Sequence, residues 1–282
     1  MTSDRVPSMS PGKPYAEVIG DPIAQSKSPM IHGFWLERLG MDAEYRRTQV
    51  RRDDLPSYIA DRRGDPLWRG CNVTMPLKLD ALLQAGERSD EAIQVGACNT
   101  LVPRSGELSA ANTDVGAIIL VLKQLAGASP ARSMTLLGTG GAARAVLVAC
   151  KSLGFTDVAI HARDQEAAFS LANSFGLSLR PQELGAPIRT DGLVNATPLG
   201  MVGAPALEAD LTAMPADGWV FDLVTAPDPT ALVADARQRG LAASGGLTML
   251  IEQAAAAFPL FFGVAPPRGP DDEDELHRQL AA

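Results

Sequence analysis

The stretch GCNVTMPLK, residues 70–78, holds the residue best placed for proton chemistry. An apolar strand ends there in Asn72 and Thr74, and Lys78 follows behind a proline. A positioned lysine amine can donate a proton to a reacting oxygen or take one back. The other interpretation is a surface cation on the first turn of a helix. We favour it less, because a cation at that end opposes the helix dipole.

Four stretches place small polar residues where predicted strands or loops end: DPIAQSKSP, NVTMPLK, GACNT and ANTD. In open α/β sheets, ligands bind outside the carboxyl ends of the strands. We therefore expect these residues to converge on one pocket whose hydroxyls, amides and carboxylate suit a polyhydroxylated substrate. The alternative is that each caps a helix or shapes a turn, most plainly Ser28, which would cap a helix beginning at Pro29. The candidates are Ser26, Ser28, Asn72, Thr74, Asn99 and Asp114.

The run MTLLGTGGAARAVLVAC predicts a dinucleotide site. A strand leads into Gly138, Gly140 and Gly141, and an alanine-rich helix follows. Such glycines let the backbone approach a pyrophosphate, which the helix N-terminus then binds. The alternative is a tight turn, which rarely needs three glycines in four residues. At the end of the next strand, Arg163 suits the 2′-phosphate of NADP and Asp164 the 2′-hydroxyl of NAD, so the pattern leaves the cofactor open.

Strand-like and helix-like runs alternate along most of the chain, which predicts an α/β fold with parallel sheets covered by helices on both faces. The pattern restarts at Met134, after the linker-like residues 126–133. We expect two domains, a substrate domain over residues 15–115 and 249–282 and a Rossmann-like domain over 116–248. The predicted strands cover 16–20, 44–50, 70–73, 96–102, 109–112, 134–137, 158–161, 192–196 and 219–224. The predicted helices cover 29–39, 55–63, 76–85, 115–125, 142–153, 165–175, 230–239 and 249–262, and the acidic tail after them ends in a surface helix.

Composition excludes several classes of protein. A net charge of −8 over 282 residues argues against a general nucleic-acid binder, which needs a basic face. Cys71, Cys98 and Cys150 form no Cys-x-x-Cys pair, so we expect buried, inert thiols in the reducing cytoplasm. No run reaches the roughly 20 apolar residues of a membrane span, and residues 1–14 have the composition of a flexible leader rather than a signal peptide. We expect no metal site.

These motifs, in this order, resemble the shikimate dehydrogenase family. The series is S-x-S-P, N-V-T-x-P-x-K, G-A-x-N-T, N-T-D, G-x-G-G-A-x-x-A, V-N-A-T-x-x-G-M and a last helix with M-L-x-x-Q-A, running from Val18 to Gly263. The resemblance implies two domains, the last helices returning to the first. It also implies an oxidoreductase that interconverts shikimate and its 3-dehydro ketone, with NADP as cofactor and NAD as the alternative. The quaternary state implied is a monomer or a homodimer.

The resemblance also implies a role for each motif residue. Lys78 and Asp114 correspond to the catalytic acid–base pair, and Ser26 and Ser28 to the pair that binds the substrate carboxylate. The remaining substrate contacts are Asn72, Thr74, Asn99, Gln253 and the pocket-closing position Thr225. The cofactor contacts are Gly138, Gly140, Gly141, Ala142, Arg163, Asp164, Thr197, Met201, Gly246 and Met249.

The chain departs from the family pattern at the pocket lid and the NADP clamp. Thr225 stands where most members carry Tyr, and Ala162-Arg163-Asp164 stands where Asn-Arg-Thr is usual, with Ala167 at the second basic position. These changes indicate a divergent member that acts on shikimate, on quinate with NAD, or on a related ring carboxylate. Two further hypotheses are a non-catalytic ligand sensor and a folate-type methylene dehydrogenase. The intact acid–base pair and glycine loop disfavour the first, and the S-x-S-P and N-T-D motifs the second.

Overall fold

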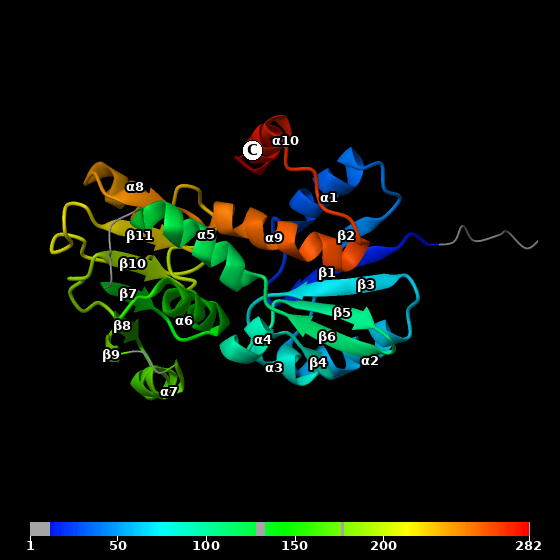
Figure 1. Ribbon diagram of the computed structural model, residues 1–282, viewed down its shortest axis with the longest axis horizontal. Helices are drawn as coiled ribbons and strands as arrows, with labels where there is room; N and C mark the ends of the chain where they lie inside the picture. The colour runs from blue at the N-terminus through cyan, green and yellow to red at the C-terminus, as the bar shows by residue number, and fades with distance from the viewer. Residues whose placement is uncertain (1–11, 128–132, 176–177, 282) are drawn as a thin grey trace, which may run out of the picture.

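Two six-stranded sheets form two lobes that lie side by side (Figure 1). This computed structural model describes residues 12–127, 133–175 and 178–281. Residues 1–11 of the predicted leader and residues 128–132 of the predicted linker lie outside this range. Within it, no helix combines the length and the apolarity that crossing a membrane requires.

The first lobe is built on a mixed sheet, which corrects our prediction of parallel sheets throughout. β1 (Tyr15–Gly20) is parallel to β2 (Glu44–Gln49) and β3 (Trp68–Val73). In contrast, β5 (Thr100–Arg104) is antiparallel to both β3 and β6 (Glu107–Ala111). β5 and β6 are antiparallel because a two-residue hairpin turn joins them, in which Ser105 and Gly106 both have positive φ, 50° and 87°. In sheet order the strands are β2 (Glu44–Gln49), β1 (Tyr15–Gly20), β3 (Trp68–Val73), β5 (Thr100–Arg104), β6 (Glu107–Ala111) and β4 (Glu87–Arg88).

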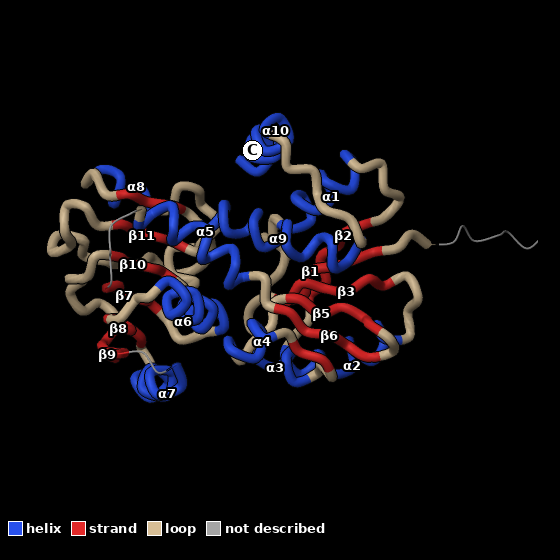
Figure 2. Tube along the Cα trace, in the orientation of Figure 1, coloured by secondary structure: helices blue, strands red, loops and turns tan. Residues whose placement is uncertain are grey.

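The second lobe has a wholly parallel sheet, as predicted. Figure 2 shows its strands, in red, grouped apart from those of the first lobe. Its central strands are β7 and β10, and the chain winds outward from them in opposite directions. The carboxyl ends of these two strands are therefore the topological switch point, where such sheets bind ligands. In sheet order the strands are β12 (Ala242–Ser244), β11 (Trp219–Asp222), β10 (Gly192–Asn195), β7 (Ser133–Leu137), β8 (Asp157–Ala162) and β9 (Ser178–Glu183). The short β4, the edge strands β9 and β12 and the helix α4 were not predicted.

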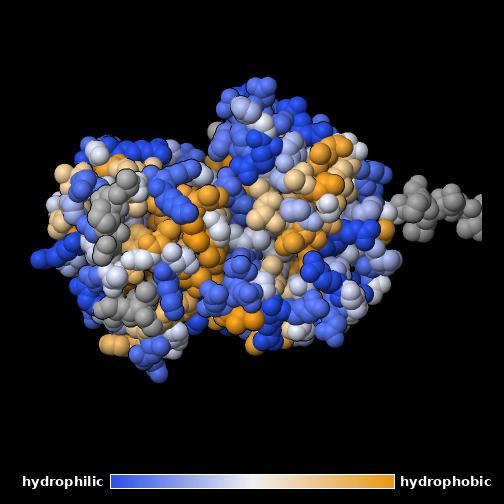
Figure 3. Space-filling view, viewed as in Figure 1, coloured by the Kyte–Doolittle hydropathy of each residue, from blue (hydrophilic) through white to orange (hydrophobic). Residues whose placement is uncertain are grey.

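Two long apolar helices, α5 (Asp114–Ala126) and α9 (Gly246–Phe262), run side by side between the lobes (Figure 1). Phe258 and Phe261 of α9 are buried in the core of the first lobe, whereas Met249, near the N-terminus of α9, belongs to the core of the second. Leu276 of α10 is buried in the first lobe, where α10 packs against α1. The predicted surface helix is thus confirmed as α10, whose outer face is hydrophilic (Figure 3). The helices are α1 (Ser28–Arg38), α2 (Leu55–Arg63), α3 (Lys78–Leu83), α4 (Asp90–Val95), α5 (Asp114–Ala126), α6 (Gly141–Leu153), α7 (Gln165–Phe175), α8 (Ala231–Gln238), α9 (Gly246–Phe262) and α10 (Pro270–Ala281), with a 3₁₀ turn η1 (Arg52–Asp54).

The three cysteines are free and buried, which confirms the prediction for them. Burial raises the pKa of the Cys98 thiol to about 12, and it raises the pKa of Cys71 and Cys150 as well. A thiol is a nucleophile only as the thiolate. These cysteines therefore belong to the packing of the two lobes.

Candidate active site

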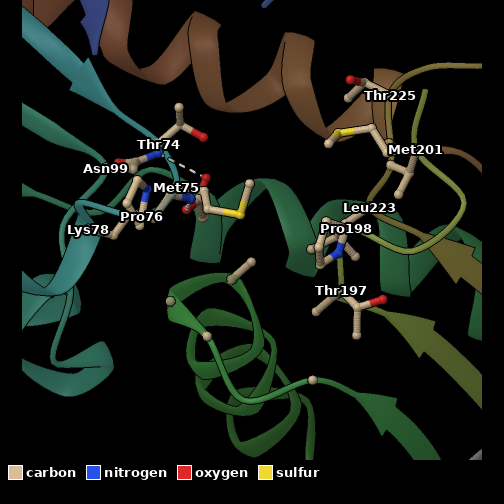
Figure 4. A pocket seen from close by; sticks show the side chains of 18 of the residues that line it. Thr74, Met75, Pro76, Lys78, Asn99, Thr197, Pro198, Met201, Leu223 and Thr225 are labelled. Atoms are coloured by element: carbon tan, nitrogen blue, oxygen red, sulfur yellow. Dashed lines mark hydrogen bonds and ion pairs between the residues drawn. The ribbon is translucent and has the colours of Figure 1, made fainter. Parts of the chain in front are cut away.

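A cavity of about 1000 Å³ lies between the lobes. Figure 4 shows Thr74, Lys78 and Asn99 on one side of it and Met201 and Thr225 on the other. Every residue that we predicted for the site lines this cavity. These residues are Ser26, Ser28, Asn72, Thr74, Lys78, Asn99, Asp114, Gly138, Gly140, Gly141, Ala142, Arg163, Asp164, Thr197, Met201, Thr225, Gly246, Met249 and Gln253.

Lys78 and Asp114 form a sheltered ion pair at the edge of the first lobe. Lys78 Nζ lies 2.6 Å from Asp114 Oδ2, and the two side chains are 16% and 4% exposed. Each is the first residue of a helix, Lys78 of α3 and Asp114 of α5. The dipole of α5 stabilises the carboxylate and opposes the ammonium at α3, so the carboxylate is the favourable partner that holds the lysine there. Shelter from water strengthens their attraction.

Asn99 joins this pair to the last long helix. Its Nδ2 lies 2.9 Å from Asp114 Oδ1, 2.8 Å from Thr113 Oγ1 and 3.3 Å from Gln253 Oε1. Its Oδ1 accepts the backbone N–H of Thr113 at 2.8 Å. Two amide hydrogens face three acceptors, so one acceptor is always left for another donor. The network therefore has room to bond a ligand hydroxyl without being rebuilt.

Asn72 differs from the other predicted substrate contacts. Its Nδ2 donates to Asn99 O at 3.2 Å and to Thr100 Oγ1 at 3.0 Å, and Tyr45 donates its hydroxyl to Asn72 Oδ1 at 2.6 Å. Both amide hydrogens are thus used inside the protein. Asn72 braces β3 against β5 and holds the backbone that carries Asn99.

Ser28 is not the helix cap that we predicted. Helix α1 begins at Ser28 itself, the capping position falls on Lys27, and no side chain caps this end. The predicted cap was wrong because Pro29 fits either of the first two helical positions. The Ser28 side chain is therefore not engaged by the helix N-terminus, and Ser26 Oγ lies 3.4 Å from the Ser28 backbone N–H. Both serines line the cavity, and so does Lys27 between them, whose Nζ donates to the backbone carbonyl of Leu280 in α10 at 2.5 Å.

The glycine loop between β7 and α6 has the shape of a phosphate cradle. Gly138 has φ +105°, and a Cβ there would lie 3.2 Å from Ala196 O, so both turn and packing require glycine. A Cβ at Gly140 would meet nothing within 4 Å. Its φ of −76° and ψ of −172° suit any residue. Neither the backbone nor a neighbouring protein atom therefore requires glycine at position 140. The space that the missing side chain leaves open fits a dinucleotide phosphate at the N-terminus of α6.

At the far end of the cavity, Asp164 is a helix cap. Its Oδ1 accepts the backbone N–H of Ala167 at 2.9 Å, which satisfies a free donor at the start of α7. Arg163 is exposed beside it. Burial, and then the charge of Arg180, lowers the pKa of the neighbouring His161, which keeps that imidazole neutral. The basic residues that line the cavity are Lys27, Arg52, Lys78, Arg144 and Arg163, against two acids, Asp114 and Asp164, so an acidic protein has a locally basic cleft.

The wall opposite Lys78 is shaped by backbone contacts. Thr197 Oγ1 donates to Asn195 Oδ1 at 2.6 Å, which fixes the loop after β10. A Cβ at Gly246 would lie 2.2 Å from Leu223 O, so only glycine lets α9 begin against the loop that follows β11. Thr225 is half-buried at the rim, and Met75, which sequence reasoning also missed, reaches into the space between the two walls (Figure 4).

Comparisons with known proteins identify the family of this chain. The profile of the shikimate dehydrogenase substrate binding domain matches residues 18–101, and that of the shikimate 5′-dehydrogenase C-terminal domain matches residues 246–271. A shikimate dehydrogenase (NADP(+)) of Sphingopyxis alaskensis is 49% identical to this chain, over 92% of the chain and 95% of that protein. The chain belongs to the shikimate dehydrogenase family. The first matched range contains the loop of Ser26 and Ser28, and also Lys78 and Asn99; the second contains Gln253.

Solved structures of the family share the whole architecture. Shikimate 5-dehydrogenase from Thermus thermophilus, in complex with NADP(H) and shikimate, aligns with a TM-score of 0.81 and 35% identity, over 94% of this chain and 99% of that one. Quinate dehydrogenase from Corynebacterium glutamicum, in complex with NAD, aligns with a TM-score of 0.78 and 27% identity, over 96% and 99%. The predicted fold class, an α/β chain with a Rossmann-like second domain, is thereby confirmed.

Proposed function

We propose that this protein is an NADP-dependent oxidoreductase that interconverts shikimate and its 3-dehydro ketone. The observation that carries the proposal is the Lys78–Asp114 pair, held at 2.6 Å where a polar pocket meets a glycine loop open to a phosphate. The relatives named as shikimate dehydrogenases (NADP(+)) support both the substrate and the cofactor. The basic cleft suits a carboxylate substrate and a phosphorylated cofactor, both of which are anions.

Proton transfer is the part of the reaction that this chain performs. The nicotinamide cofactor, when bound, supplies or accepts the hydride. In the reducing direction, the Lys78 ammonium donates a proton to the carbonyl oxygen, which becomes the alcohol; in the oxidising direction, the neutral amine takes that proton back. Asp114 holds the amine in place and stabilises its charged form. Because the pair is mostly shielded from water, its position is set before the substrate arrives.

The polar residues around the pair would hold the ring. We assign the Ser26 and Ser28 hydroxyls to the substrate carboxylate. Thr74, Asn99 and Gln253 would bond ring hydroxyls, since Asn99 and Gln253 already belong to one hydrogen-bonded network. The predicted role of Asn72 becomes support of this network, because its amide hydrogens are in use.

The cofactor end favours NADP through Arg163. Asp164 has a structural role, because it caps α7 through its hydrogen bond to Ala167. An acid at position 164 therefore does not by itself indicate that the cofactor is NAD. Quinate with NAD is the second candidate, favoured by Thr225, which leaves the rim without the ring that most of the family carries there. We place the reaction in the cytoplasm, which the free cysteines support, and in a monomer or homodimer. The substrate domain would comprise residues 15–115 and 249–282, and the cofactor domain residues 116–248.

The test is nicotinamide reduction, followed by absorbance, with shikimate and quinate each paired with NADP and NAD. We expect turnover to be fastest with shikimate and NADP. Turnover confined to quinate or NAD would overturn the main assignment in favour of the second candidate. No turnover in any of the four mixtures, with cofactor binding intact, would refute both the shikimate and the quinate assignment.

A further inference from the structure

Gly141, the third glycine of the loop, lies against the side chain of Lys78. A Cβ at Gly141 would lie 3.1 Å from Lys78 Cβ and 3.2 Å from Lys78 Cδ. The other close neighbour is Leu79 Cδ1, at an ordinary 3.6 Å. Gly141 belongs to the cofactor lobe and Lys78 to the substrate lobe, so this contact joins the two lobes at the proposed proton donor.

Lys78 has little freedom to move away from an added methyl group. Its Cβ is fixed to the backbone of α3, and its carbonyl accepts the backbone N–H of Cys98 at 2.9 Å. At the other end of the side chain, Nζ is held by Asp114 at 2.6 Å. A side chain held at both ends cannot absorb an overlap by changing rotamer alone, so either its stem or the spacing of the lobes must change.

The three glycines of the loop therefore have different reasons to be glycine. Gly138 needs its positive φ, and Gly140 leaves space open to the cavity. Gly141 has no positive φ, and it is the first residue of α6, where an alanine would fit the backbone. The atoms that a Cβ at Gly141 would crowd are those of Lys78.

We propose that Gly141 is a positioning residue for Lys78. By lacking a Cβ, it lets the cofactor lobe come close enough for the proton donor of one lobe to meet the hydride site of the other. The inference rests on the proposed function, because it assigns Lys78 to proton transfer. It adds that the third glycine of the motif serves the acid–base pair, whereas the second serves the phosphate.

The experiment compares Gly141→Ala with its neighbour Gly140→Ala. A shift of a few tenths of an ångström at Lys78 should lower kcat of Gly141→Ala about tenfold, because a 1 Å misplacement costs on the order of 100-fold. Its Kd for NADPH, from the fluorescence of the reduced nicotinamide, should stay close to the wild-type value, since the phosphate space is untouched. Gly140→Ala should show the reverse, a Kd raised about tenfold by a methyl group in that space. An unchanged kcat in Gly141→Ala, or a Kd raised as in Gly140→Ala, would overturn the proposal.

Thermal melts test the contact without relying on activity. Gly141→Ala should lower Tm by about 2 °C or more in the wild-type background. In a Lys78→Gly background, which removes both crowded atoms, the same change should cost no Tm. An equal loss of Tm in both backgrounds would show that Lys78 is not what Gly141 accommodates. Because these melts need no substrate, they can succeed even if the four-mixture assay refutes the proposed function.

Discussion

The two walls of the cleft are prepared for their ligands in different ways. On the substrate wall, Lys78, Asp114, Asn99 and Gln253 already bond one another. On the cofactor wall, the glycine loop offers backbone and empty space, and Asp164 is bonded to its own helix. One wall is organised by side chains and the other by the absence of side chains. Truncation should therefore damage the first wall, and added atoms the second.

The largest effect should come from removing the central side chain of the substrate wall. We expect Lys78→Ala to lower kcat about 1000-fold, because general acid–base catalysis contributes roughly 10²–10⁴-fold. Steady-state kinetics with shikimate and NADP measure it. The matched control is Lys123→Ala, which removes an exposed lysine of α5 and should leave kcat unchanged. If Lys78→Ala retained wild-type turnover, the substrate wall would be a binding surface without catalytic chemistry.

A smaller effect should follow from neutralising the acid at the cofactor wall. Asn caps helices about as well as Asp, so Asp164→Asn keeps the bond to Ala167 and removes only the charge. We expect Kd for NADP to fall about fivefold and Kd for NAD to change little, because a negative charge beside Arg163 repels a 2′-phosphate. Glu166→Gln, nearby on α7, controls for general charge. Weaker NADP binding in Asp164→Asn would assign Asp164 to the cofactor rather than to the helix.

Thr225 lies at the rim, and restoring a ring there should sharpen selectivity. Thr225→Tyr should raise the ratio of kcat/KM for shikimate to that for quinate roughly threefold, less than the tenfold or more of a fully buried pocket contact, because position 225 is only half-buried. Thr225→Val, which keeps the size and removes the hydroxyl, is the matched control. A ratio lowered by Tyr would mean that the open rim already selects shikimate.

The smallest effect concerns the core of the substrate lobe. His32 is fully buried, stacks on Tyr45 with ring centroids 3.9 Å apart, and neither ring nitrogen has a partner among the described residues. Burial lowers the pKa of His32 to about 3. Below about pH 6.5 the unfolded chain binds a proton that the folded protein refuses, so stability falls as the pH drops toward 3.

Replacing His32 should therefore reduce acid sensitivity. Between pH 7.5 and 5.5, the loss of Tm in His32→Phe should be about 3 °C smaller than in the wild type. His277→Gln, at an exposed histidine of α10, should behave as the wild type does. Equal losses of Tm in His32→Phe and the wild type would mean that His32 does not contribute to the acid sensitivity.

The sequence predicted those features of the fold and the site that are determined by residues close together in the chain. Helix α7 has the predicted bounds, because Asp164 supplies its cap and its apolar residues recur at helical spacing. The pocket residues were found because each motif ends a strand or begins a helix at the sheet edge. Two separate short strands, 96–102 and 109–112, were predicted on either side of Ser105 and Gly106, but the hairpin that joins them was not, because the alternation of strands and helices was taken to mean parallel sheets throughout.

Contacts between distant residues escaped prediction. The bracing role of Asn72 depends on Tyr45, 27 residues earlier in the chain, and the reason for Gly141 depends on Lys78 in the other lobe. Neither contact leaves a trace in spacing or periodicity. They follow only once both sheets are folded and α5 and α9 have brought the lobes together.

When both ligands are bound, we expect the substrate on one wall of the cleft and the cofactor on the other to meet at Lys78. A crystal structure with shikimate and NADP bound tests this meeting point directly. We predict the reacting oxygen of the ring within hydrogen-bond distance of Lys78 Nζ, with the pyrophosphate over Gly140. A ring whose reacting oxygen lay away from Lys78, or a pyrophosphate bound elsewhere than at the glycine loop, would contradict the proposed site.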